Sequence, residues 1–409
     1  MLKILHFADA HIDIATHGRR DPETGLPLRV LDFLKALDQI VDTAIAQKVD
    51  LVLFAGDAYK DRTPVPTFQR EFGKRIIRLS EAGIPTVLLV GNHDLSPATG
   101  RAHALQEFDT LQVPHVHVIS QPCFWKPEDL EGLPIQIIGL PWVSRSSLMA
   151  ALQLEGDQIS QIYSELETRL SELVQEWLQE VDPTLPVILT AHMSIQGAKY
   201  GGERSVMLGN DLVLSGGLVR DPRLDYVALG HIHKAQNLND GNHPPVIYPG
   251  SIERVDFGEA EDEKYFVIAE VEKGHTAVVW HKLAGRPFID RSVMVDSPDN
   301  TLEQMISGLP SRENLRDAIV RLIVLYPRIW EASLDEKGIR QYAEEAFEFH
   351  LVRRPQMDAR IRLPKDQAIS TMNHLELLEL YWRTVNLEKE EKEDLQKSAR
   401  EIMAEIRGT

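Results

Sequence analysis

The chain has 409 residues, of which 43% are hydrophobic and 26% are charged, and its formal net charge is −18 at pH 7. This length predicts two or three domains, and the composition is typical of a soluble globular protein. The acidic balance argues against a protein that coats nucleic acid by charge alone, although a small basic groove on an acidic surface can still bind DNA.

No apolar run approaches the roughly 20 residues that a membrane-spanning helix needs, so we expect no membrane partner. The first seven residues are typical of a buried strand and lack the apolar length and cleavage site of a signal peptide. We therefore expect a cytoplasmic protein, associated with the nucleoid in a prokaryote. Cys123 is the single cysteine, which excludes an intrachain disulfide and a cysteine zinc cluster. Any metal must be held by His, Asp, Glu or Asn.

Residues 1–285 alternate short apolar runs with amphipathic stretches. The runs are rich in Val, Ile and Leu, as strands buried on both faces are, and they cover 4–8, 51–55, 86–90, 135–139, 187–191, 226–229 and 265–270. Two predicted helices, 29–48 and 67–82, separate the first three strands, and a third is expected within 145–180. The β-α-β-α-β order predicts an α/β sandwich around one or two central sheets.

A domain boundary is predicted near Arg286-Pro287. Beyond it, an apolar strand (318–326), a helix (335–347) and an extended run (350–362) predict a small α+β domain. The tail from 366 onward combines a leucine cluster with a dense charge run, which predicts two short helices whose apolar stripes need a partner surface.

Metal-competent side chains follow the ends of five predicted strands. The motifs are Asp9-Ala10-His11, Gly56-Asp57, Gly91-Asn92-His93-Asp94, Ala191-His192 and Gly230-His231-Ile232-His233. Ligands collect at the carboxyl ends of strands in open α/β sheets. We therefore expect seven side chains to gather in one place: Asp9, His11, Asp57, Asn92, His192, His231 and His233.

These residue types suit a centre with two divalent cations. Hydrolysis of a phosphodiester needs an activated water, neutralised equatorial oxygens and a stabilised leaving alkoxide, and two cations about 3.5–4 Å apart supply all three. A carboxylate such as Asp57 can bridge them, and imidazole and carboxylate ligands suit Mn, Fe or Zn better than Mg or Ca. Any one of these motifs alone is more often a capped turn or a pair of ordinary histidines, but all five in this order are hard to obtain by chance.

At these residues the sequence resembles the calcineurin-like metallophosphoesterase superfamily, whose pattern is Asp-x-His, Gly-Asp, Gly-Asn-His-Asp, His and Gly-His-x-His. The resemblance covers most of residues 1–285 and implies a metallophosphoesterase β-sandwich flanked by helices. It implies two ions that share Asp57, the first also held by Asp9, His11 and His233, and the second by Asn92, His192 and His231.

The resemblance also implies two catalytic residues that do not ligate. His93 would protonate the leaving oxygen or stabilise the transition state, and Asp94 would orient His93.

Further segments resemble SbcD-type DNA repair nucleases. The stretch from Tyr248 to Glu259 closely matches the segment that those proteins carry after Gly-His-x-His, and Gly139-Leu140-Pro141-Trp142 also fits. This resemblance implies a manganese-dependent exonuclease and endonuclease that processes DNA ends and hairpins in double-strand break repair. It implies a homodimer with a nuclease domain (1–285), a capping domain (286–365) and a helical tail (366–409).

In that family the tail binds the SbcC-type coiled-coil ATPase. ATP would then be bound by the partner, because this chain has no Gly-x-x-x-x-Gly-Lys-Ser/Thr loop.

One residue departs from the pattern of many archaeal and eukaryotic relatives. Lys60 stands where they place a histidine, three residues after the bridging Asp57, that helps to position the DNA backbone for exonucleolytic cutting. The strength of the exonuclease activity relative to the endonuclease activity, and the polarity of cleavage, therefore stay open.

Two other functions also stay open. One is a small-molecule or cyclic-nucleotide phosphodiesterase of the same superfamily, which usually lacks the capping domain and the tail. The other is a non-catalytic scaffold, which predicts missing ligands, whereas all seven are present here.

Overall fold

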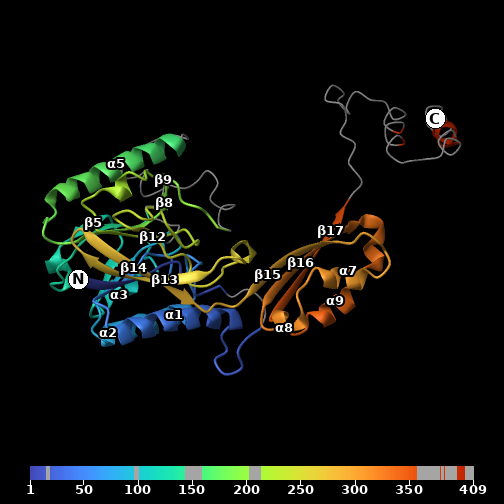
Figure 1. Ribbon diagram of the computed structural model, residues 1–409, viewed down its shortest axis with the longest axis horizontal. Helices are drawn as coiled ribbons and strands as arrows, with labels where there is room; N and C mark the ends of the chain where they lie inside the picture. The colour runs from blue at the N-terminus through green and yellow to red at the C-terminus, as the bar shows by residue number, and fades with distance from the viewer. Residues whose placement is uncertain are drawn as a thin grey trace. The chain divides into compact units, whose positions relative to one another are not determined.

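The computed structural model (Figure 1) describes residues 1–14, 19–95, 101–142, 159–201, 213–356, 378, 382 and 394–400. The chain divides into two compact units. The first comprises Met1–Arg291, Pro310–Leu322 and Arg340–His350, and the second comprises Ser292–Leu309, Ile323–Ile339 and Leu351–Thr409. The boundaries at 285/286 and 365/366 stay predictions.

The first unit contains two six-stranded sheets. One has the order β14-β13-β1-β2-β3-β4, in which β1 to β4 are parallel and the β13–β14 hairpin is antiparallel to β1. Its strands are β1 (Leu2–Phe7), β2 (Leu51–Phe54), β3 (Thr86–Leu89), β4 (Val116–Ile119), β13 (Lys264–Glu272) and β14 (His275–Leu283). The carboxyl ends of β1, β2 and β3 therefore lie along the same edge of this sheet.

The second sheet has the order β11-β12-β10-β7-β6-β5, with parallel inner strands and antiparallel edge strands. Its strands are β5 (Cys123–Trp125), β6 (Gln136–Leu140), β7 (Val187–His192), β10 (Tyr226–Gly230), β11 (Gln236–Asn237) and β12 (Val246–Tyr248). The remaining short elements of the first unit are α3 (Gln106–Thr110), β8 (Ser194–Ile195), β9 (Val213–Leu214), α8 (Arg312–Leu315), η1 (Pro127–Leu130), η2 (Leu218–Arg220) and η3 (Phe257–Glu259).

The two sheets pack face to face between layers of helices. A cluster of buried residues joins the inner faces, with Leu53 of the first sheet packed in the same cluster as Ile137 and Ile188 of the second. On the outer side of the first sheet lie α1 (Leu28–Gln47) and α2 (Pro66–Glu81), and on the outer side of the second lies α5 (Ile159–Glu180). The predicted α/β sandwich is confirmed, and its central strands are mostly apolar because both of their faces are buried.

Asp225 joins the two sheets at the edge opposite the strand ends that carry the motifs. Its buried carboxylate accepts hydrogen bonds from the backbone N–H of Val187 (2.7 Å) at the start of β7 and of Gly274 (2.6 Å) in the β13–β14 turn. The Lys273 ammonium lies 3.0 Å from the same carboxylate. One side chain thus satisfies donors from both sheets.

A three-stranded sheet follows in the order β15-β16-β17, built from β15 (Phe288–Met294), β16 (Ile319–Pro327) and β17 (Glu348–Gln356). Between its strands lie α7 (Thr301–Ser307), η4 (Arg328–Ser333) and α9 (Glu336–Tyr342). The helix predicted for 335–347 is too long. After Tyr342 the backbone bonds to the start of β16 instead, through Asp317 N–H to Glu345 O (3.1 Å) and Glu348 N–H to Ala318 O (3.4 Å).

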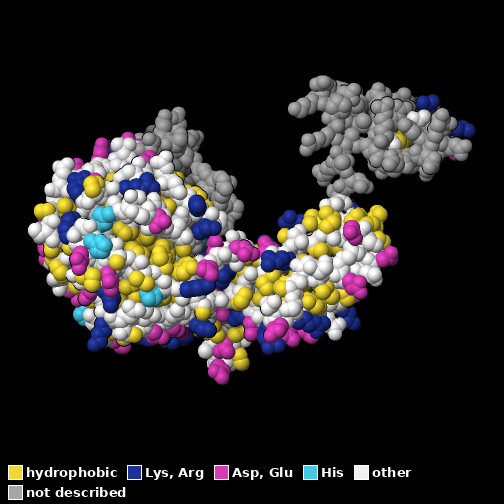
Figure 2. Space-filling view, viewed as in Figure 1, with side chains coloured by type: hydrophobic (Ala, Val, Ile, Leu, Met, Phe, Trp, Pro, Cys, Tyr) yellow, Lys and Arg dark blue, Asp and Glu magenta, His cyan; other side chains and the backbone are white. Residues whose placement is uncertain are grey.

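Most of the predicted tail, 366–409, lies outside the described residues, and so do residues 145–158 of the helix predicted within 145–180. In the tail, residues 394–400 are helical. None of the described helices is both long and apolar enough to cross a membrane. On the face shown in Figure 2, the Lys and Arg side chains of the first unit are scattered among Asp and Glu and do not form one basic band.

We predict that Asp225→Ala lowers the free energy of unfolding by about 2–4 kcal/mol, because the buried N–H of Val187 loses its acceptor and the bond to Gly274 N–H is lost with it. Urea denaturation measures the change. Asp240→Ala, at an exposed position, is the control and should change stability by less than about 0.5 kcal/mol. Equal stability of the two variants would contradict the assigned role.

Candidate metal centre

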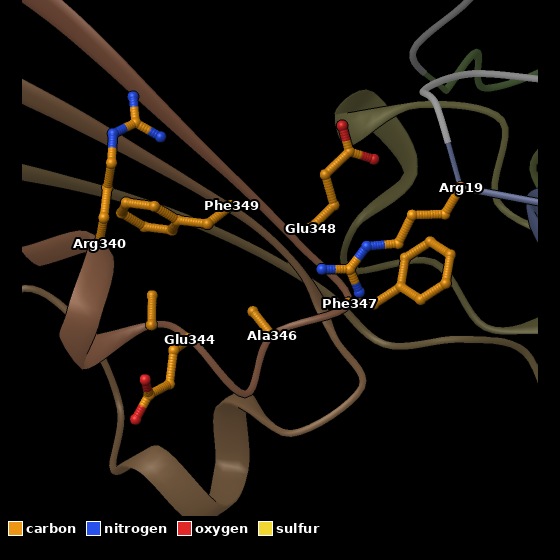
Figure 3. A pocket seen from close by; sticks show the side chains of 8 residues that line it. Arg19, Arg340, Glu344, Ala346, Phe347, Glu348 and Phe349 are labelled. Atoms are coloured by element: carbon orange, nitrogen blue, oxygen red, sulfur yellow. The ribbon is translucent and has the colours of Figure 1, made fainter.

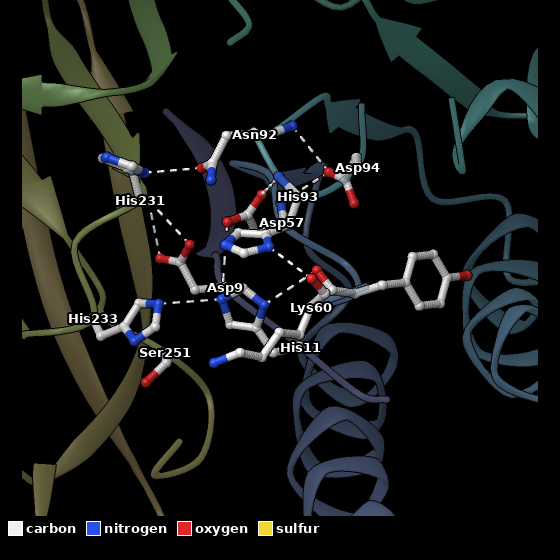
Figure 4. A network of polar contacts seen from close by, with 12 residues as sticks. Asp9, His11, Asp57, Lys60, Asn92, His93, Asp94, His231, His233 and Ser251 are labelled. Carbon is white, nitrogen blue, oxygen red and sulfur yellow. Dashed lines mark hydrogen bonds and ion pairs between the residues drawn. The ribbon is translucent and has the colours of Figure 1, made fainter. Parts of the chain in front are cut away.

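The five motif-bearing strand ends meet in one place (Figure 4). Asp9 N–H donates to Gly56 O (2.9 Å) and Ala10 N–H donates to Asp57 O (2.8 Å), so the loops after β1 and β2 run side by side. Gly230 pairs with His192 at the ends of β10 and β7. The structure brings all seven residues of the predicted ligand set into this cluster, six of them buried and Asn92 half-buried.

Asp9, His11 and His233 form the first group, with their ligand atoms all within 4.8 Å of one another. The Nε2 atoms of the two histidines lie 3.1 Å apart. Nδ1 of His11 lies 3.2 Å from Tyr59 O and Nδ1 of His233 lies 2.6 Å from a Glu259 oxygen. Because those oxygens accept, each Nδ1 carries the proton and the two Nε2 lone pairs face each other. Two facing lone pairs fit a shared cation.

Asp57, His192 and His231 form the second group, again within 4.8 Å of one another. Nδ1 of His192 donates to Ala55 O at 2.6 Å, so Nε2 is the nitrogen that can bind either a second proton or a cation. That Nε2 lies 3.0 Å from Asn92 Oδ1 and 3.3 Å from Asp57 Oδ2, both of them acceptors. Asn92 Oδ1 is also 3.0 Å from Nδ1 of His231. The donor set of this group therefore also fits a cation.

Asp57 lies between the two groups. Its Oδ2 is 3.3 Å from Nε2 of His192 and 3.8 Å from Nε2 of His11, one histidine of each group. Its Oδ1 accepts a hydrogen bond from the backbone N–H of His93 at 2.8 Å. A Cβ on Gly91 would lie 2.2 Å from Oδ1, so only glycine leaves room for this carboxylate. The position is that of a bridging ligand.

The electrostatics of the cluster favour a cation. Burial opposes ionisation of Asp57, but the surrounding histidines, His192 first, outweigh it and hold its pKa well below its usual range. Burial also lowers the pKa of His192, yet the carboxylates of Asp57 and Asp9 raise it to about 9. A field that attracts a proton this strongly to a buried imidazole also attracts a divalent ion.

Asp94 contacts the main chain of the neighbouring loops. Its buried carboxylate accepts hydrogen bonds from three backbone N–H groups, of Asp57, Ala58 and Gly91, each at 2.9 Å. It therefore positions the loops after β2 and β3, the second of which carries His93. Burial, followed by the charge of Asp57, raises the pKa of Asp94 to about 7.

The His93 ring is held by the main chain. Its Nδ1 lies 2.7 Å from the carbonyl oxygen of Lys60, and its ring meets that of His11 edge-on with centroids 5.3 Å apart. His93 is half-buried at the margin of the cluster, and the catalytic roles of His93 and Asp94 stay predictions.

A further residue, Glu259, was missed by the sequence reasoning as a functional group. It is buried, and besides His233 its carboxylate contacts Lys264 Nζ (2.7 Å), Ser251 Oγ (3.2 Å) and Val255 N–H (3.0 Å). Lys264 and His233 outweigh the effect of burial and hold the pKa of Glu259 well below its usual range. Glu259 is the last residue of the stretch from Tyr248 noted above. Its contact with His233 depends on the tertiary fold and could not be predicted from that stretch.

The first unit also contains a cavity of about 370 Å³, which Figure 3 shows. Arg19, Arg340, Glu344, Phe347 and Phe349 are among its lining residues, and none of the predicted site residues is. It is therefore separate from the metal centre.

A family profile described as calcineurin-like phosphoesterase matches residues 2–235. The chain belongs to this family. The match spans every motif of the cluster, so this phosphoesterase is a hydrolase acting on phosphate esters with a candidate two-metal site.

Several curated proteins are similar to the phosphoesterase. It is 26% identical over 296 residues to the "Uncharacterized metallophosphoesterase YhaO" of Bacillus subtilis, which covers 69% of this chain but only 62% of that protein. It is 25% identical over 414 residues to the SbcD component of the nuclease SbcCD of Escherichia coli, covering 95% and 94%. It is 26% identical over 254 residues to "DNA double-strand break repair protein Mre11" of Saccharolobus solfataricus, covering 61% and 54%.

Among solved structures, TT1561 of Thermus thermophilus aligns with 68% of this chain and 98% of its own, at 16% identity and a TM-score of 0.37. A score this low does not by itself establish a shared topology.

We predict that Glu259→Gln weakens the binding of one of the two ions about 10–100-fold. The amide cannot neutralise the buried Lys264, and it holds His233 less firmly. Titration with manganese, followed by calorimetry, measures both sites without relying on catalysis.

Glu253→Gln is the matched control, because Glu253 is equally buried in the same segment but accepts from the backbone N–H of Arg286 (3.0 Å) and not from a predicted ligand. If Glu259→Gln and Glu253→Gln bind both ions like the wild type, Glu259 does not position His233.

Proposed function

We propose that the phosphoesterase is a metal-dependent DNA nuclease with exonuclease and endonuclease activity. It would process DNA ends and hairpins in double-strand break repair, in the cytoplasm and at the nucleoid of a prokaryote. The observation that carries the proposal is the cluster of seven complementary ligands around Asp57 with His93 at its margin. The likeness to a nuclease component along 95% of this chain, well beyond the family domain, supports DNA as the substrate.

The first ion would be held by Asp9, His11, Asp57 and His233, and the second by Asp57 with the three remaining ligands, Asn92, His192 and His231. When bound, two such ions supply Lewis acidity and activate water. The mixed imidazole and carboxylate donors favour manganese, iron or zinc over magnesium or calcium, and we propose manganese.

His93 would move the proton. A carbonyl oxygen can only accept, so the contact with Lys60 O keeps a proton on Nδ1 of His93 in both charge states. The proton given to the leaving oxygen therefore comes from Nε2. Asp57 and Asp94 fix the backbone that carries this ring, through His93 N–H and Gly91 N–H respectively.

Two alternatives remain as competing proposals. A small-molecule or cyclic-nucleotide phosphodiesterase would use the same centre but does not account for a match that covers 95% of the chain. A non-catalytic scaffold does not account for the complete ligand set.

We predict that wild type with manganese cleaves an end-labelled DNA hairpin and that His93→Ala loses about 10²–10⁴ of the rate while retaining two ions. Gel analysis of the products and metal content per chain are the two measurements. His275→Ala, an exposed histidine in β14, is the control and should keep full activity. Turnover of small phosphodiesters without cleavage of the hairpin, even with the ATPase and ATP, would favour the small-molecule alternative.

We further propose that the chain forms a homodimer and that the predicted tail, 366–409, binds an SbcC-type coiled-coil ATPase. Deletion of 366–409 should abolish binding of that ATPase in a pull-down and leave turnover of bis(p-nitrophenyl) phosphate unchanged. Unchanged ATPase binding by the shortened chain would show that the partner docks elsewhere.

A further inference from the structure

A cavity of about 950 Å³ opens beside the candidate metal centre, with His93 in its wall. Its volume is at the upper end of the roughly 300–1,000 Å³ of ligand sites in proteins. None of the seven predicted metal ligands lines it, so the centre does not need it to hold its ions.

One wall of this cavity is apolar. Val65, Phe68 and Val255 line it, and Val65 is 52% exposed. Val65 is also the N-cap residue of α2, where its side chain makes no capping hydrogen bond. Ser, Thr, Asp or Asn at this position would stabilise the helix. An exposed valine at this position stabilises the helix less than a capping residue would. Binding of an apolar group of a ligand would explain why a valine stands there.

Two exposed cations are among the residues that line the cavity. Lys60 and Arg62 line it and are exposed, and neither side chain has a hydrogen bond or ion pair with any residue that the structure describes. Both can therefore bind an incoming phosphate without breaking a contact to any of the described residues.

Three carboxylates also line the cavity, and each is engaged by the backbone. Asp13 accepts from the N–H groups of Lys60 (2.5 Å) and Asp61 (2.9 Å), Asp61 accepts from that of Thr63 (2.9 Å), and Asp256 accepts from that of Gly258 (2.6 Å). These donors offset part of the negative charge and turn the oxygens toward their own loops.

We propose that this cavity is a subsite for one unpaired nucleotide, the one that carries the leaving oxygen. Its base and sugar lie against Val65, Phe68 and Val255, and its next phosphate lies between Lys60 and Arg62. The side follows from His93, because the proton donor in the cavity wall must face the oxygen that leaves. A base that lies against these apolar side chains is no longer stacked in a duplex, so the subsite takes a nucleotide that is unpaired next to the cut. This inference rests on the proposed nuclease function.

The test uses single-stranded oligonucleotides with one cleavable phosphodiester, all other linkages being phosphorothioates. Three substrates carry thymine on both sides of the cut, an abasic tetrahydrofuran on the leaving side, or the same abasic unit on the other side. Loss of the leaving-side base should raise KM about tenfold with a smaller effect on kcat, since contact of a base with a protein surface is worth about one decade of affinity or more. Loss of the base on the other side of the cut should change neither KM nor kcat.

Val65→Asn should reduce the difference between the first two substrates, because it removes the apolar contact while offering α2 a favoured N-cap residue. Its thermal stability should be no lower than that of the wild type, which separates the effect from misfolding. Val279→Asn is the matched control, since Val279 is 51% exposed in β14, and it should keep the full tenfold difference.

Arg62→Gln tests the phosphate contact. The slope of log KM against log salt should fall by about 0.7, the value for one phosphate contact on a single strand. Arg169→Gln, at an exposed arginine of α5, should leave the slope unchanged.

Equal KM values for the first two substrates overturn the subsite even if the hairpin is cleaved. So does a raised KM for the substrate whose abasic unit lies on the other side of the cut. An unchanged salt slope in Arg62→Gln overturns the phosphate contact. Failure of wild type to cleave any DNA overturns the proposed function and, with it, this inference.

Discussion

A single buried carboxylate, that of Asp57, organises the candidate centre. One of its oxygens lies between a histidine of each metal group, and the other holds the backbone of the proposed proton donor. Such a group is costly to bury, and here the surrounding imidazoles offset that cost. Everything around Asp57 serves its placement. Gly91 leaves room for its carboxylate, and Asp94 holds the loops after β2 and β3 with three hydrogen bonds.

The next layer of contacts orients the imidazoles. His11, His192 and His233 each donate Nδ1–H to a fixed oxygen, supplied by Tyr59, Ala55 and Glu259 respectively. Two of these oxygens belong to the main chain next to Asp57, so the same loop presents the carboxylate and selects the tautomers of its neighbours. Only His233 depends on a side chain, and that side chain belongs to a buried ion pair with Lys264. Within the first metal group, one histidine therefore depends on the main chain and the other on a side chain.

Much of this arrangement could be predicted from the sequence. A strand buried on both faces is a mostly apolar run, and the runs noted in the sequence match seven strands to within two residues: β1, β2, β3, β6, β7, β10 and β13. The motifs at the ends of five of them locate the cluster. Strand β12 is also buried but is missed, because a run of three residues is too short to stand out. Strand β14 escapes prediction because it is half exposed and has no such run. The helix predicted to reach residue 347 ends at Tyr342, because the following backbone is hydrogen-bonded to the start of β16 instead. Glu259 and the true contacts of Asp94 depend on which groups are buried together, and spacing alone does not carry that information.

Four of the seven ligands have a backbone that is unusual for their residue type. Asp9, His11, Asp57 and His231 have φ of 50°, 39°, 64° and 94°, a region costing about 1–3 kcal/mol for side chains other than glycine. Few amino acids tolerate these positions, so variation at the strand ends is narrowly limited. The surface loops that line the neighbouring cavity carry no such limit at Lys60, Arg62 or Val65, which do not have a positive φ. Over evolutionary time the choice of substrate can therefore diversify while the chemistry stays as it is.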